Sequence, residues 1–242
     1  MDERLKAIVD NFESTKIGLD ETFNFHCTMC GNCCINREDI LLSPKDIYNV
    51  SKELGTSTDN FFEKYCEVYI GNNSRIPIVR LKPHGSDNRC PLLKKAKCRV
   101  HHAKPTVCAM YPVGRCIMAD NPKEGLKDID NNMVQYIFNN PECGDDSETH
   151  TVREWLESFG IPIQDEFFLK WQQAVLKMGT IFRTIERGMS QNVMEQVWTA
   201  AFVGLYLSYD LGKEFLPQFE DNSMKFFNMM DSAFSLENDT LR

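Results

Sequence analysis

The chain has 242 residues, of which ten are cysteine, and its formal net charge is −8. Hydrophobic residues make up 42% of it, which allows a packed core and excludes a wholly disordered chain. The acidic excess argues against a nucleic-acid-binding protein, because no basic surplus is present to neutralise phosphates.

Neither a signal peptide nor a membrane span is predicted. The first thirty residues hold no apolar stretch of the kind that a signal peptide needs. The best membrane candidate, 197–207, is too short for a spanning helix, which requires about 20 residues. We therefore expect a cytoplasmic protein whose cysteines act as thiols or thiolates rather than as disulfides.

The first helices carry clear end signals. Residues 2–13 show a short amphipathic pattern that is typical of a helix. The run 43–46, Ser-Pro-Lys-Asp, gives an N-cap, a proline in the first turn and an acid at the third helical position. The helix that it begins should end at Leu54, with Gly55 as the stop.

Short elements follow as far as residue 138. Residues 76–81 are β-branched and predict a strand, and Pro77 would confine that strand to the edge of a sheet. The expected elements are a helix over 59–69, this strand, a turn over 83–88, and strands over 115–118 and 133–138.

The second part of the chain is predicted to be helical throughout. Thr151 and Glu154 form a capping box, and apolar residues recur at helical spacing over 164–187, 191–210 and 225–234. These faces fit the core of a helical bundle, and a groove for a protein partner or a protein substrate stays open as the alternative.

The fold class that we predict is α+β and mostly helical. A cysteine-rich metal-binding domain with short strands should occupy residues 1–146, and an all-helical region that packs on it should occupy 147–242. The boundary is placed in the acidic, turn-like stretch 141–147, after the last cysteine.

The densest chemical signal is a run of four thiols in eight residues, Cys27, Cys30, Cys33 and Cys34. Thiolates are soft ligands that suit zinc, iron–sulfur clusters or Cu(I). Side chains of adjacent residues diverge by roughly 100° on a helix and 180° on a strand, so we expect Cys33 and Cys34 to bind different metal atoms. Two centres or one polynuclear cluster fit this run better than one zinc ion does.

Further thiols downstream complete two sets of four, the number that a structural zinc ion or a 4Fe–4S cluster takes. The predicted metal ligands are Cys27, Cys30, Cys33, Cys34, Cys90, Cys98, Cys108 and Cys143.

Other residues of this region are left as alternatives. Cys66 follows an aromatic run and reads as a buried apolar thiol, whereas Cys116 stays open. His26, His101 and His102 could each replace a thiolate, although a surface or supporting position is the more common one for histidine. A local basic run over 94–104 is a solvated face, or it offsets the charge of thiolate-ligated centres or docks an acidic partner.

Three blocks in order resemble a known family. They are Cys27-x-x-Cys30-Gly-x-Cys33-Cys34; then Cys90-Pro-Leu-Leu, Cys98-x-Val and Lys104-Pro105-x-x-Cys108-x-x-Tyr111-Pro112; and then Cys143-Gly144 with Thr151-Val-Arg-Glu-Trp-Leu. This pattern is similar to that of the CxxCxxCC cysteine-cluster family, also called YkgJ-like, whose zinc- or iron-chelating members include the flagellin lysine N-methylases. The resemblance covers about Phe25 to Leu156 and implies metal binding, with an iron–sulfur cluster in the methylase branch.

Three functions remain open at this point. The favoured one is an iron–sulfur protein with two centres, 4Fe–4S rather than zinc, in a redox, sensing or accessory role. The others are a protein-lysine N-methyltransferase-like enzyme and a zinc-stabilised interaction module. Whether the chain is an enzyme stays undecided, because it shows no P-loop, HExxH motif or Ser/His/Asp order.

Overall fold

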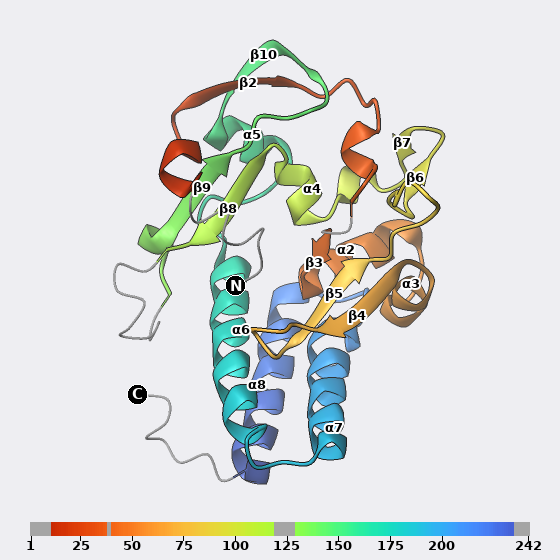
Figure 1. Ribbon diagram of the computed structural model, residues 1–242, viewed down its shortest axis with the longest axis vertical. Coiled ribbons are helices and arrows are strands. Elements are labelled where there is room, and N and C mark those ends of the chain that lie inside the picture. Colours follow the sequence, from red (N-terminus) through yellow and green to blue (C-terminus); the bar gives the residue numbers. More distant parts are fainter. Residues whose placement is uncertain (1–10, 38–39, 119–128, 235–242) are drawn as a thin grey trace.

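The computed structural model describes residues 11–37, 40–118 and 129–234 (Figure 1). Its α-helices are α2 (Pro44–Leu54), α3 (Thr58–Tyr65), α4 (Thr106–Met110), α5 (Val152–Ser158), α6 (Glu166–Ile185), α7 (Gln191–Phe202) and α8 (Phe215–Phe234). Short 3-10 turns are η1 (Asn32–Cys34), η2 (His101–Ala103) and η4 (Asn131–Met133), and η5 (Val203–Leu207) is a π-turn that continues α7.

The strands are short and form four small antiparallel sheets, in the orders β1-β9-β8, β10-β2, β3-β5-β4 and β6-β7. Their bounds are β1 (Lys16–Ile17), β2 (Thr22–His26), β3 (Leu41–Leu42), β4 (Cys66–Ile70), β5 (Pro77–Leu81), β6 (Leu93–Lys94), β7 (Lys97–Cys98), β8 (Val113–Ile117), β9 (Val134–Phe138) and β10 (Asp145–Thr151). The predicted α+β, mostly helical class is confirmed.

The capping signals act as the sequence predicts. Ser43 and Asp46 form a reciprocal capping box at the start of α2, and Gly55 ends that helix with a φ of 62°. Thr151 and Glu154 form a second box at α5. These ends are predictable because each depends on hydrogen bonds within one turn of backbone.

Two expectations about the middle of the chain are wrong. The helix predicted over 59–69 ends at Tyr65, because the following residues form β4 and pair with β5. The strand with Pro77 is the central one of its sheet rather than an edge. Pro77 is tolerated there because it is the first residue of β5, where its missing N–H removes little of the ladder.

The N-terminal and C-terminal predictions are borne out in part. A helix is predicted over 2–13, and residues 11–15 are helical. Residues 1–10 lie outside the described residues. The tail contains α6, α7 and α8, and α8 begins ten residues before the predicted 225–234 segment. β10 runs across residue 146 and pairs with β2.

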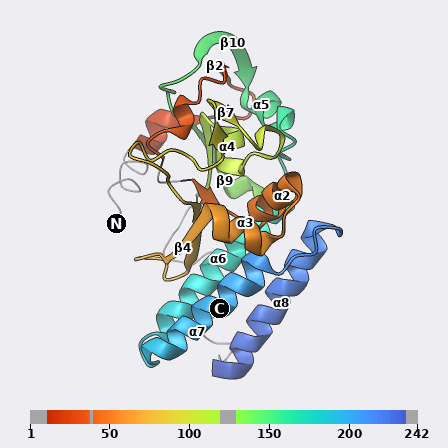
Figure 2. The ribbon, with the colours of Figure 1, turned by 90° about the vertical axis from the view of Figure 1, so that its right-hand side faces the viewer.

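The core consists of two hydrophobic clusters. The larger one joins the three long helices of the tail to α2, α3 and the β3-β5-β4 sheet. The smaller one lies under β2, β8 and β9 and includes Val152, Trp155 and Leu156 of α5. In Figures 1 and 2 the tail helices lie side by side at one end of the molecule, and the β10-β2 ribbon lies at the other. Among the helices that the structure describes, none has the length and apolar character needed to cross a membrane.

A buried ion pair joins β8 to the start of α6. Arg115 of β8 contacts Asp165, the N-cap of α6, at 3.0 Å, with side-chain exposures of 5% and 8%. The Arg115 guanidinium also lies over the Phe168 ring at 3.7 Å from its centroid. The first turn of the tail is thus anchored to the cysteine-rich part of the chain.

Candidate metal centre

Most of the predicted ligands lie in or next to short elements, and two lie in loops. Cys27 follows β2, Cys33 and Cys34 lie in η1, Cys98 ends β7, Cys108 lies in α4 and Cys143 precedes β10, while Cys30 and Cys90 lie in loops.

The first cysteine loop folds back on the second. Gly31, with a φ of 79°, makes a turn that other residues rarely adopt, and a Cβ there would lie 3.3 Å from the carbonyl oxygen of Ala96. The backbone N–H of Cys90 donates to the carbonyl oxygen of Cys34 at 2.8 Å. These contacts bring thiols from distant parts of the sequence to one place.

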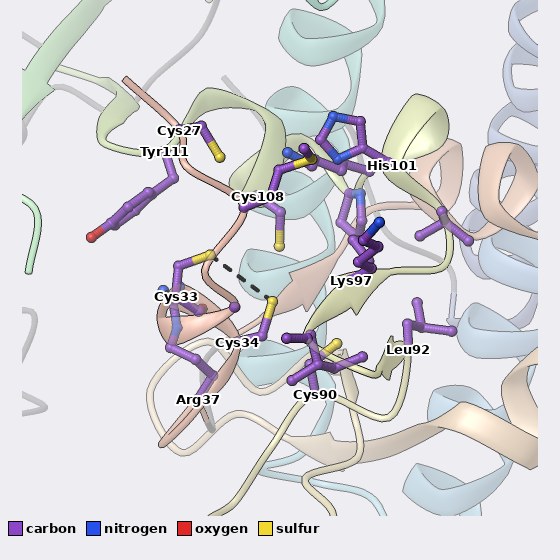
Figure 3. A pocket seen from close by; sticks show the side chains of 18 of the residues that line it. Cys27, Cys33, Cys34, Arg37, Cys90, Leu92, Lys97, His101, Cys108 and Tyr111 are labelled. Carbon is purple, nitrogen blue, oxygen red and sulfur yellow. Dashed lines mark hydrogen bonds between the residues drawn. The ribbon is translucent and has the colours of Figure 1, made fainter. Parts of the chain in front are cut away.

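Two adjoining cavities collect the thiols, and Figure 3 shows the larger one. The larger one, of about 420 Å³, is lined by Cys27, Cys33, Cys34, Cys90, Cys98 and Cys108. The smaller one, of about 40 Å³, is lined by Cys27, Cys30, Cys33, Cys108 and Cys143. Each of the eight predicted ligands therefore lines at least one cavity, and their role as ligands stays a prediction.

The same thiols divide between the two hydrophobic clusters. Cys90 is buried in the larger cluster, and Cys34, Cys98 and Cys108 pack against it. Cys27 and Cys143 pack against the smaller cluster. The cavities therefore lie at the seam between the two halves of the core.

The two adjacent cysteines do not diverge as the sequence analysis expects. The Sγ atoms of Cys33 and Cys34 lie 3.9 Å apart. Two thiolates bound at about 2.3 Å to one tetrahedral zinc ion are separated by about 3.8 Å. The side chains therefore do not diverge as an ideal helix or strand predicts, because both rotate toward the same space. Binding of the two thiols to different metal atoms stays a prediction.

Burial and mutual contact keep several of these thiols protonated. The pKa of Cys33 is raised by its contact with Cys34 and by burial. Contact with Cys33 lowers the pKa of Cys34, but contact with Cys90 and burial together raise it by more. The net effect raises the pKa of Cys34 to about 12. Burial likewise raises the pKa of Cys108. Since a metal binds the thiolate, metal uptake must release protons from this site.

The exposed thiol behaves differently. Backbone N–H groups of Asn32 and Gly144 lower the pKa of Cys30. Cys30 is exposed on the surface, so it is the thiol of the set that is most accessible to an incoming ion or oxidant.

Cations and imidazoles form part of the wall of the larger cavity. Arg37, Lys97, Lys104, His101 and His102 all line it, and Figure 3 shows Lys97 and His101 across the space from Cys33 and Cys34. Burial lowers the pKa of His101, with help from the nearby charges of Lys104 and His102. The imidazole of His101 is therefore neutral at pH 7 and able to bind a metal or accept a hydrogen bond.

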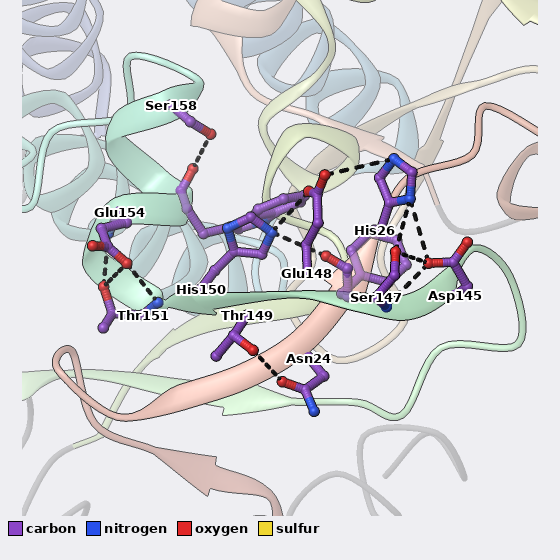
Figure 4. Close-up of polar contacts among 12 residues, drawn as sticks. Asn24, His26, Asp145, Ser147, Glu148, Thr149, His150, Thr151, Glu154 and Ser158 are labelled. Atoms are coloured by element: carbon purple, nitrogen blue, oxygen red, sulfur yellow. Dashed lines mark hydrogen bonds and ion pairs between the residues drawn. The ribbon is translucent and has the colours of Figure 1, made fainter.

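The remaining candidates are not brought to the cavities. Cys66 is 6% exposed and belongs to the larger cluster, which confirms the prediction of a buried apolar thiol. Cys116 lies in β8, near the carbonyl oxygen of Gln135 at 3.8 Å. His26 lines neither cavity and contacts Asp145 at 3.3 Å and Glu148 at 3.8 Å (Figure 4).

Two lining residues were not singled out from the sequence. Tyr111 lines both cavities, and the Cys143 thiol lies 3.8 Å from its hydroxyl. Burial and this contact raise the pKa of Tyr111 to about 12. Its place in the second sequence block was the available signal, whereas nothing in the sequence marks Arg37 as a lining residue.

The thiols surround the cavities without yet converging on single points. Among residues 11–37, 40–118 and 129–234, no group of three or more His, Cys, Asp and Glu side chains is arranged to hold a metal ion. Side-chain rotation would have to bring the thiolates together around a metal. The donor set itself, with eight thiols and a neutral imidazole, fits soft or borderline metals such as iron and zinc.

Comparison with known proteins agrees with this donor chemistry. A family model described as "CxxCxxCC: Putative zinc- or iron-chelating domain" matches residues 26–143. No curated protein and no solved structure matches the chain. The matched residues include all eight predicted ligands, and the family is the one that the cysteine spacing resembles. Residues 26–143 are therefore similar to a putative zinc- or iron-chelating domain, and this match supports metal binding.

Proposed function

We propose that the chain is an iron–sulfur protein with two Cys-ligated centres, preferably 4Fe–4S, that serve a redox, sensing or accessory role. The observation that carries the proposal is the collection of eight thiols around two adjoining cavities. Iron–sulfur centres supply one-electron chemistry to a protein that holds them.

The size of the larger cavity supports a polynuclear centre at that site, whereas the smaller cavity, of about 40 Å³, gives no such support. One water molecule needs about 10–15 Å³ of cavity volume. The larger cavity, of about 420 Å³, therefore has room for far more than a single ion. A lone zinc ion among four thiolates needs no such space. The mainly apolar walls, including Leu81, Leu92 and Val100, also suit a cluster that is shielded from water.

The packing supports one division of the ligands. Cys34, Cys90, Cys98 and Cys108 share the larger hydrophobic cluster and the larger cavity. Cys27, Cys30, Cys33 and Cys143 share the smaller cavity, and two of them pack against the smaller cluster. We assign the first set to one centre and the second set to the other.

A zinc protein is the second candidate, and one distance favours it. The 3.9 Å between the Sγ atoms of Cys33 and Cys34 suits two ligands of the same zinc ion. In a 4Fe–4S cluster each iron takes one cysteine, so neighbouring thiols need not approach so closely. In this alternative the metal stabilises the fold and the tail carries the interaction.

Anaerobic purification followed by iron, zinc and acid-labile sulfide analysis separates the two candidates. Brown protein with about eight iron and eight sulfide per chain supports two 4Fe–4S clusters. Colourless protein with about two zinc and no sulfide refutes the iron–sulfur proposal and supports the alternative.

Serine variants test the division of the ligands. Cys34→Ser and Cys143→Ser should each remove about half of the metal, because they belong to different centres. Cys116→Ser is the matched control, since that half-buried thiol lines neither cavity, and it should keep full metal content. Loss of all metal from either single variant that remains folded would contradict the two-centre assignment.

A further inference from the structure

The β6-β7 hairpin places a basic surface beside the thiol cavities. The chain has a net charge of −8, yet residues 88–118 contain no Asp or Glu. The tip of the hairpin contacts the first cysteine loop, since Gly31 faces the carbonyl oxygen of Ala96. Cys98, at the end of β7, is itself one of the predicted ligands.

The lysines of the β6-β7 hairpin, Lys94, Lys95 and Lys97, occupy positions at which lysine is unfavourable. Lys95 and Ala96 form its two-residue loop, with φ values of 50° and 61°. Such a loop favours Asn-Gly, because both positions require positive φ. Lys94 and Lys97 lie directly opposite each other in the ladder, and like charges in that arrangement are destabilising. A fold selected for stability alone would not place three lysines here.

Two of these lysines have no counterion among the residues that the structure describes. Lys94 and Lys95 are exposed and form no ion pair with any residue that the structure describes. The β10-β2 ribbon differs, because its Asp145 and Glu148 contact His26 and His150 of the same ribbon (Figure 4). Two adjacent lysines at the hairpin tip thus lack a partner among the described residues.

The three lysines divide by where they lie. Lys97 lines the larger cavity and so faces the thiols. Lys94 and Lys95 line none of the cavities described here, so offsetting thiolate charge does not account for them. Met29 of the first cysteine loop is 56% exposed.

We propose that Lys94 and Lys95 form the docking site for an acidic one-electron carrier protein. The assignment rests on the proposed iron–sulfur function, which gives such a carrier a reason to approach. The carrier takes or delivers one electron, and no bond forms or breaks. A local basic patch is needed because the rest of this acidic chain repels an acidic protein. Interfaces of this kind are small and depend strongly on salt.

Binding of a plant-type [2Fe–2S] ferredoxin, an acidic carrier, to the anaerobically purified protein tests the site by isothermal titration calorimetry. The variant is Lys94→Glu with Lys95→Glu. The matched control is Lys213→Glu with Lys225→Glu, which changes the net charge equally at exposed lysines of the tail. We expect the dissociation constant to rise about tenfold or more for the hairpin variant at low salt, less than threefold for the control, and little for either at high salt.

Each other outcome counts against the site. Unchanged binding in the hairpin variant, or equal weakening in both variants, overturns local docking. If the Glu variant loses metal or fails to fold, Lys94→Gln with Lys95→Gln takes its place, and it should weaken binding by a smaller factor. Metal analysis of the wild type reports on the proposed function separately. Zinc without iron would overturn the assignment of an electron carrier, even if binding depended on the lysines.

Discussion

The carboxylate of Asp46 offers a quantitative test of how the cysteine-bearing part of the fold is held together. Asp46 is 5% exposed and lies in the first turn of α2. One of its oxygens accepts from the backbone N–H and the hydroxyl of Ser43, at 2.8 and 2.7 Å. The other accepts from the N–H and the hydroxyl of Thr106, both at 2.7 Å. Asp46 thus joins α2 to α4, which carries Cys108.

The variant Asp46→Asn keeps the shape of the side chain but turns one acceptor into a donor. The amide can satisfy either Ser43 or Thr106, and its NH₂ group then faces the two donors of the other residue. Hydrogen bonds to a charged group contribute about 1.5 kcal/mol each, so the loss of two predicts about 3 kcal/mol of destabilisation. That is a large fraction of the roughly 5–15 kcal/mol that stabilises a typical domain.

Urea denaturation at neutral pH measures this loss, and Glu154→Gln is the matched control. Glu154 has the same place in the capping box of α5, but it is exposed and contacts only Thr151 among the described residues (Figure 4). Its substitution should have a much smaller effect, within the scatter of surface changes. If Asp46→Asn and Glu154→Gln lower the free energy of unfolding equally, the bridge between α2 and α4 is not a stabilising element and the reasoning is wrong.

Three further predictions concern backbone strain, the buried ion pair and pH. Gly144→Ala should lower the free energy of unfolding by more than about 2 kcal/mol and reduce metal content, because the new Cβ would overlap the last carbonyl oxygen of β2. Gly160 also has a positive φ but open space around it, so Gly160→Ala should cost only about 1 kcal/mol. Equal losses of stability in the two variants would contradict this reasoning. Arg115→Met should destabilise the chain by about 3–5 kcal/mol in urea melts, because it leaves a buried carboxylate unpaired; a loss below about 1 kcal/mol would refute it. Contact with Arg75 lowers the pKa of Glu186 below its ordinary value of 4.5, so this pair should stabilise the fold fully above about pH 4.5 and lose its effect as pH falls through the lowered value. Arg75→Gln should therefore weaken the fold near pH 7 and flatten that acid dependence, and parallel curves would count against the pair.

The sequence was most informative where structure depends on neighbours along the chain. Both capping boxes and the stop at Gly55 follow from hydrogen bonds within one helical turn. The apolar stripe over 164–187 predicted α6 to within two residues at each end, because a long helix repeats its signal.

It was least informative where pairing between distant segments decides. Residues 66–70 continue a helical pattern, yet they pair with β5 and become a strand. The same pairing places Pro77 in the middle of a sheet. β2 and β10, which join residues about 120 apart, have no local signal in the sequence that would predict their partnership.

The same distinction explains what the cysteine pattern could and could not predict about the centre. Thiol spacing selected eight residues, and all eight line the two cavities, while their role as ligands stays a prediction. The proposed division of the thiols depends on the core, since Cys34 packs with the larger cluster and Cys143 with the smaller one. An ideal-helix argument separated Cys33 from Cys34, but rotation about their side-chain bonds brings the two sulfurs to 3.9 Å. At that distance Cys33 and Cys34 can each bind a different one of the two proposed centres, or both can bind one ion. A Cys33→Ser variant that retains the metal of the larger cavity would favour the first arrangement, and one that loses it would favour the second.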